Sequence, residues 1–254
     1  MDLNGKHWPL VIRALLASLL LWGSVAHSQT CRLALVLALD VSSSVNAEED
    51  QLQRTGLAAA LLTAEVQQAF FAAGQPVALH AFEWSGRYDQ VLLLPNWTMI
   101  DSPQTLQQVA HAIATSPRSR YDMPTALGHA MGFAATLLQR APPCTQHTID
   151  VAGDGQNNDG FSAALAYGAF PFENVTVNAL VVATGDSPPS ELTAYFQTQV
   201  IRGPGAFLEV AQGFGDYENA MIRKLLRELA AQALSAADPA QPDLELHRII
   251  NIPG

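Results

Sequence analysis

LVLALDVSSS, the stretch Leu35–Ser44, decides the fold of this chain. Its apolar residues are followed by an acid, Asp40, and then by serines at alternate positions, Ser42 and Ser44. A short apolar run that ends in polar residues is typical of a strand buried on both faces of a parallel sheet. Ligands of open α/β sheets bind beyond the carboxyl ends of the strands, so these side-chain oxygens lie where a site is expected. A hard cation prefers such oxygen ligands.

Similar apolar runs recur along the chain and alternate with stretches of helical period. The expected strands are Leu33–Leu39, Val77–Phe82, Val91–Leu94, Thr148–Ala152, Val175–Ala183 and Ala206–Val210. The expected helices are Ala47–Leu62, Pro103–Ala114, Thr125–Gln139, Phe161–Ala169, Pro189–Val200 and Phe214–Ala233. Because strands that alternate with helices are typical of α/β folds, we predict a doubly wound, mostly parallel sheet of six strands with helices on both faces.

Length and composition indicate one globular domain. The chain has 254 residues, of which 49% are hydrophobic and 14% charged. This balance allows a full hydrophobic core, and the length argues against two such domains. The formal net charge of −10 argues against nucleic acid as a partner, because an acidic protein is repelled by a polyanion.

Both ends are expected to lie outside this domain. Residues 1–28 have the features of a secretory signal peptide, with basic residues before a short apolar run at Ala14–Trp22 and small residues near the end. Because the run is too short to cross a bilayer, we expect a secreted or periplasmic mature chain without a membrane span. A lipid anchor on Cys31 is the alternative. Residues 235–254 contain prolines and no sustained period, which predicts a loose or docked tail.

Two further segments supply oxygens that would complete a cation site. Met123–Ala130, MPTALGHA, places Thr125 at the start of an expected helix. Ile149–Gly155, IDVAGDG, places Asp154 just after an expected strand. With the opening segment, they resemble the D-x-S-x-S, T-x-x-G and acidic elements of the metal-ion-dependent adhesion site in the von Willebrand factor type A (VWA) domain. The three elements occur in the family's order, and the resemblance covers roughly Leu33–Ala230.

The resemblance implies a particular sheet. It implies a VWA domain over residues 31–233 with the strand order 3-2-1-4-5-6, in which Val91–Leu94 is a short antiparallel edge strand. The first and fourth strands are neighbours in that order, and Cys31 and Cys144 precede them. A disulfide between the two cysteines is therefore expected at the edge opposite the metal site, in keeping with an exported protein. Two free buried thiols are the alternative.

The resemblance also implies a function. Hydroxyl ligands would hold Mg²⁺, or else Mn²⁺ or Ca²⁺, without neutralising it, while the two acids act partly through water. Such an ion can accept a carboxylate from a partner protein, so the chain is expected to be a binding module and not an enzyme. It looks like the stand-alone secreted VWA proteins of bacteria. This resemblance does not identify a ligand. The expected metal ligands are Asp40, Ser42, Ser44, Thr125 and Asp154.

Other interpretations of the same residues remain open. Taken singly, the serines and Thr125 can cap helices and Asp154 can belong to a turn. An enzyme could use Asp40 in metal-dependent hydrolysis or phosphoryl transfer, but the sequence has neither a nucleophile elbow nor a phosphate-binding loop that would favour this. A third possibility is a structural VWA scaffold with an empty metal site.

Neighbouring residues are candidates for the rim of the binding surface. Two of them end the second strand at the same sheet edge as Asp40, and three follow Asp154, where they can also form a turn. The candidates are Glu83, Trp84, Asn157, Asn158 and Asp159.

Overall fold

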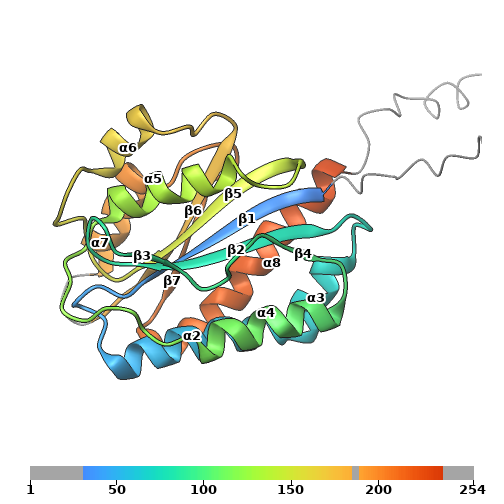
Figure 1. Ribbon diagram of the computed structural model, residues 1–254, viewed down its shortest axis with the longest axis horizontal. Helices are drawn as coiled ribbons and strands as arrows, with labels where there is room; N and C mark the ends of the chain where they lie inside the picture. Colours follow the sequence, from blue (N-terminus) through green and yellow to red (C-terminus); the bar gives the residue numbers. More distant parts are fainter. Residues whose placement is uncertain (1–30, 185–188, 237–254) are drawn as a thin grey trace, which may run out of the picture.

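The computed structural model describes residues 31–184 and 189–236 and forms a single α/β sandwich (Figure 1). The predicted signal peptide at 1–28 and residues 237–254 of the predicted tail lie outside the described residues. The strands are β1 (Cys31–Asp40), β2 (Val77–Trp84), β3 (Gln90–Leu92), β4 (Thr98–Ile100), β5 (Cys144–Gly153), β6 (Val175–Val182) and β7 (Leu208–Ala211). The helices are α2 (Ala47–Leu62), α3 (Ala64–Phe71), α4 (Pro103–Thr115), α5 (Leu127–Leu138), α6 (Ala163–Ala169), α7 (Pro189–Tyr195) and α8 (Tyr217–Ala236).

The sheet has the predicted strand order. Its strands lie in the order β3-β2-β1-β5-β6-β7. The neighbours β2, β1, β5, β6 and β7 pair parallel in that order. β3 pairs antiparallel with the carboxyl half of β2, as expected for the edge strand. The predicted number of six strands is corrected to seven, because β4 pairs antiparallel with the amino half of β2. β4 has only three residues, too few to show a strand period.

The strand β1 is the centre of the core, and all ten of its residues are buried. Successive side chains point to opposite faces of a strand. Leu33, Leu35 and Leu37 accordingly pack with α2, α3, α4 and α8, whereas Ala34 and Val36 pack with α5, α6 and α7. Figure 1 shows these two helical layers on opposite sides of the sheet. The apolar run is continuous because both faces of β1 are covered.

The predicted disulfide is confirmed. Cys31 and Cys144 are the first residues of β1 and β5 and lie opposite each other in register, with their Cα atoms 4.4 Å apart. The bond therefore joins neighbouring parallel strands at the amino edge of the sheet, opposite the edge where the predicted metal ligands lie. Cys31 is engaged in this bond, which leaves no thiol there for a lipid. Within the described residues, no helix is both long and apolar enough to cross a membrane.

Candidate metal centre

The predicted metal ligands come from three segments at the carboxyl edge of the sheet. Asp40 is the last residue of β1, and Ser42 and Ser44 lie in the loop that leads to α2. Thr125 lies just before α5, and Asp154 directly follows β5. Ser44 is exposed, whereas the other four residues are buried, so the group opens to solvent on the Ser44 side.

The oxygen atoms of these residues form a continuous chain of contacts. Thr125 Oγ1 donates to Ser42 Oγ at 3.2 Å, and the oxygens of Ser42 and Ser44 lie 3.1 Å apart. Ser44 Oγ donates to Asp154 Oδ1 at 2.6 Å. The Ser42 amide donates to Asp40 Oδ1 at 2.8 Å, whereas Asp40 Oδ2 is buried without a hydrogen-bond partner. Side chains far apart in the sequence thus place five polar groups in one compact cluster.

The two carboxylates oppose each other's ionisation. Burial and, second, the charge of Asp154 raise the pKa of Asp40 to about 8, although the Ser42 hydrogen bonds and the nearby Arg118 lower it. A negative charge that is buried beside another is costly unless a positive charge compensates it. A divalent cation among these oxygens would supply that charge.

The spacing of the oxygens fits a small divalent cation. An octahedral magnesium ion with ligands at about 2.0–2.1 Å has neighbouring ligand oxygens about 2.9 Å apart. The separations of 3.2, 3.1 and 2.6 Å along the chain bracket this value. Across residues 31–184 and 189–236, no three His, Cys, Asp or Glu side chains are grouped so as to hold a metal, so an ion at this position would need the hydroxyl oxygens as well.

The loop that carries the serines is fixed on several sides. The Val41 amide donates to Trp84 O at 2.9 Å, and the Ser43 amide donates to Met123 O at 2.8 Å. At the end of the loop, Asn46 caps α2 and forms a capping box with Glu49. Such reciprocal capping satisfies the free amides of the helix start. The loop is therefore held against β2, against the segment before Thr125 and against α2.

Asn157 and Asn158 hold the Thr125 segment in place. Asn158 Oδ1 accepts from the Thr125 amide at 2.8 Å, and the Asn158 amide donates to Thr125 O at 3.0 Å. Asn157 Oδ1 accepts from the amide of Gly128 at 3.1 Å, in the first turn of α5. A Cβ atom at Gly128 would lie 2.0 Å from Phe161 O, which explains the glycine of the T-x-x-G element. Both asparagines thus have structural contacts at the site.

The prediction of a surface rim is wrong for Glu83 and Trp84, because both side chains are fully buried. Glu83 forms an ion pair with the buried Arg54 under α2. Trp84 packs in the core on the α5 side of the sheet. Asp159, the remaining rim candidate, forms an ion pair with Arg87 at 2.6 Å near the surface.

Sequence reasoning missed Arg118 and Arg54. Arg118 donates to backbone carbonyls of the serine loop, and Arg54 forms a buried ion pair with Asp50 as well as with Glu83. These contacts mostly join residues that are far apart in the sequence, so no local sequence pattern predicts them. The available signal was that a chain with few basic residues carries two arginines, Arg118 and Arg120, shortly before the T-x-x-G element.

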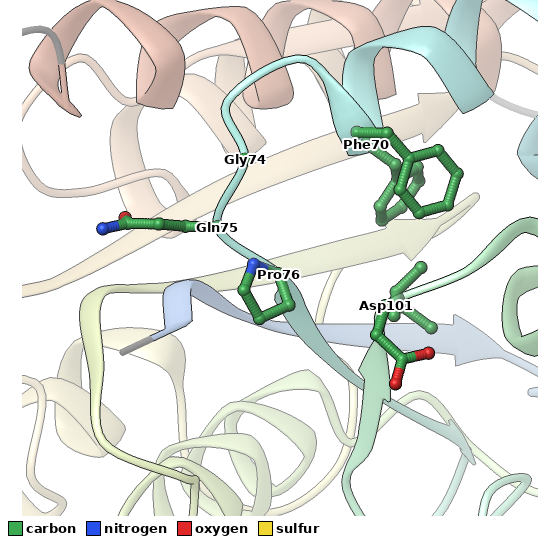
Figure 2. A pocket seen from close by; sticks show the side chains of 7 residues that line it. Phe70, Gly74, Gln75, Pro76 and Asp101 are labelled. Atoms are coloured by element: carbon green, nitrogen blue, oxygen red, sulfur yellow. The ribbon is translucent and has the colours of Figure 1, made fainter. Parts of the chain in front are cut away.

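The chain also has a cavity of about 200 Å³ at the other end of the sheet, near the start of β2 (Figure 2). Phe70 and Pro76 form part of its wall, and Asp101 lies at its side. The carboxylate of Asp101 accepts a hydrogen bond from Thr105 Oγ1 at 3.0 Å. This cavity shares no residue with the candidate metal centre.

The strand order is that of a VWA-type fold, and solved structures share this fold. Proximal thread matrix protein 1 of the mussel byssus, with a zinc-occupied MIDAS motif, matches with a TM-score of 0.56 and 18% identity over 79% of this chain and 48% of that chain. The von Willebrand factor type A protein of Catenulispora acidiphila matches with a TM-score of 0.54 and 14% identity over 80% and 43%. The pilus adhesin SpaC of Lactobacillus rhamnosus GG matches with a TM-score of 0.57 and 13% identity, over 81% of this chain and 30% of that chain.

The chain belongs to the family described as "Protein of unknown function (DUF1194)", whose model matches residues 30–233. No curated protein matches the sequence. The chain spans less than half the length of the three solved chains named above. At their level of identity, the likeness concerns the fold alone.

Proposed function

We propose that this chain is an exported, metal-dependent protein-binding module. Asp40, Ser42, Ser44, Thr125 and Asp154 would bind a divalent cation through their oxygens, Mg²⁺ or else Mn²⁺ or Ca²⁺. The observation that carries the proposal is the unbroken contact of these oxygens beside Asp40 Oδ2, a buried carboxylate oxygen with no hydrogen bond. The zinc-occupied MIDAS motif of the byssus protein supports divalent-cation binding in this fold.

The cation would bind the partner as well as stabilise the loop. Hydroxyl ligands leave it electron-deficient, so it can accept a carboxylate from an Asp or Glu of a partner protein. The exposed Ser44 marks the side from which that carboxylate would approach. Tyr88 and Tyr121, 90% and 62% exposed, lie in the two segments that contact the site loops and offer aromatic surface for a protein ligand. The signal-like residues 1–28 and the disulfide support export to an oxidising compartment.

Calorimetric titration with Mg²⁺ and Mn²⁺ tests the metal centre. We expect Asp40→Ala to lower the affinity by more than about 100-fold, since even residues behind the ligands typically contribute 10–100-fold. Glu173→Ala, which removes an exposed carboxylate from the loop before β6, is the matched control and should bind as the wild type does. An Asp40→Ala protein that binds the ion as tightly as the wild type would refute the site.

Affinity capture from the native compartment tests the binding role. The expected result is a partner that the wild-type chain retains with Mg²⁺, releases on chelation and does not bind when Asp40 is alanine. A partner that both chains retain with or without metal would favour a structural scaffold. Turnover of a substrate that depends on Asp40 would favour the enzyme alternative, which no contact in the described site supports.

A further inference from the structure

We propose that Arg118 is a positioning residue of the metal centre, whose guanidinium sets the shape of loop 41–46. The inference rests on the proposed metal binding and adds a residue that does not contact the ion. Loop 41–46 carries Ser42 and Ser44 and contains no helix or strand. Apart from one internal backbone hydrogen bond, from the Val45 amide to Ser42 O at 3.0 Å, its backbone conformation depends on contacts from outside the loop.

One side chain supplies many of these contacts. Arg118 Nη1 donates to Val45 O at 2.6 Å, and Nη2 donates to Val41 O at 2.8 Å and Ser42 O at 3.1 Å. Nη1 also lies 3.3 Å from Asn46 O. The guanidinium thus ties the beginning of the loop to its end, with both serine ligands between the attachment points.

Arginine is suited to this task, and lysine is not. A guanidinium is a rigid plane with five donors in a fixed fork, whereas an ammonium is a compact charge with three donors. A lysine at position 118 would keep the positive charge near Asp40 but could not span carbonyls at both ends of the loop. The substitution Arg118→Lys therefore changes the geometry of the contacts while it keeps the charge.

The backbone around Arg118 is itself anchored to a buried ion pair. Ser116 Oγ accepts from Arg54 Nη1 at 2.6 Å, and the Ser119 amide donates to Glu83 Oε1 at 2.7 Å. Arg54 and Glu83 are 1% and 0% exposed and bond directly to each other. The residues on both sides of Arg118 are thus attached to the same rigid pair. Glu83 consequently acts on the site from within the core.

The guanidinium is also held on its outer side. It lies 5.0 Å from the ring centroid of Tyr121, in cation–π geometry. Nε donates to Arg120 O at 2.7 Å, within the same segment. Arg118 is therefore oriented by protein contacts alone, and preorganised groups of this kind tune metal affinity.

Mg²⁺ titration of Arg118→Lys and Arg118→Met tests the inference. We expect both variants to bind Mg²⁺ about 10–100-fold more weakly than the wild type, as outer residues of metal sites do. Arg202→Lys is the matched control, because Arg202 stacks on Tyr167 and bonds to β6 at the amino edge of the sheet. It should retain wild-type affinity.

Outcomes separate this inference from the proposed function. Failure of the wild type and Arg202→Lys to bind metal would overturn the metal centre itself. If the wild type binds Mg²⁺ and the affinity of Arg118→Lys lies within twofold of it, the positioning role alone is overturned. A loss of affinity in Arg118→Met only would have the same meaning, since the lost charge would then be the cause.

A rescue experiment guards against general unfolding. Arg118→Gly, titrated in millimolar guanidinium chloride, should regain Mg²⁺ affinity relative to the same protein in sodium chloride of equal ionic strength. The same preparation serves as its own folding control. No regain in a variant whose circular dichroism matches that of the wild type would count against the inference.

Discussion

Lys224 of α8 is fully buried, and its charge compensates two buried carboxylates between α8 and β5. Its Nζ lies 2.6 Å from Asp150 Oδ1 and 3.0 Å from Glu228 Oε1. Asn178 Nδ2 donates to the same Glu228 oxygen at 2.8 Å. Two carboxylates with one ammonium leave an excess of negative charge. Burial and, second, Glu228 raise the pKa of Asp150 to about 7, although Lys224 lowers it.

This cluster makes stability depend on pH. Because the folded-state pKa of Asp150 lies above its ordinary value of 3.8, the folded protein binds that proton more tightly than the unfolded chain. Its contribution to stability is complete below about pH 4 and is lost as the pH rises through about 7. We expect Asp150→Asn to lose less stability than the wild type between pH 5 and pH 8, as measured by urea unfolding in the presence of chelator.

The control for this prediction is Asp101→Asn, which changes an exposed aspartate and should keep the wild-type pH dependence. Equal pH dependence in Asp150→Asn and the wild type would show that the buried cluster does not titrate in this range.

At the scale of elements, the disulfide joins β1 to β5 and closes a loop with a sequence separation of 113 residues. By the chain-entropy estimate, a loop of this size stabilises the folded state by about 4–5 kcal/mol. The Cys31→Ser, Cys144→Ser double variant should therefore unfold at lower urea concentration by a corresponding amount. Since the bond lies at the edge opposite the candidate metal centre, the Mg²⁺ affinity of the double variant should equal that of the wild type. An unchanged unfolding midpoint would contradict the estimate.

Elements with a long, regular pattern were predictable from the sequence. The helix Ala47–Leu62 was predicted from its period with the bounds that the structure has, and its cap is Asn46, not Ser42 or Ser44. α3 was missed, since Thr63 ends α2 and at once begins the next helix, leaving no loop between them. The π-helical turn Phe196–Val200 that continues α7 was predicted as ordinary helix, because five residues are too few to show a different period.

The candidate site was predictable only in part. The D-x-S-x-S element and Asp154 lie at the carboxyl ends of the neighbouring strands β1 and β5, so their proximity followed from the topology. The burial of individual side chains could not be predicted from the topology. Glu83 lies near the carboxyl end of β2, at the same edge as Asp40, yet its side chain is fully buried against Arg54 of α2. Arg118 lies in a segment without period, and its contacts reach across more than 70 positions of the chain. Pattern analysis has no access to contacts of this kind.

At the scale of the whole molecule, metal binding should raise thermal stability. A ligand that binds only the folded state stabilises it by about 2.7 kcal/mol at a concentration 100 times its Kd. For a domain of this size, that corresponds to a rise of roughly 5–10 °C in Tm. Differential scanning calorimetry with Mg²⁺ and with chelator measures the shift. A Tm that does not respond to the ion would exclude tight binding to the folded state.

The covalent link between β1 and β5 also turns the first half of the domain into a closed ring. The ring contains the serine loop, the turn with Tyr88 and the segment with Arg118. A single proteolytic cut in any of these surface loops would leave both pieces attached. A molecule nicked in this way would keep its candidate metal ligands on one covalently joined chain. Damage of this kind would be visible only after reduction.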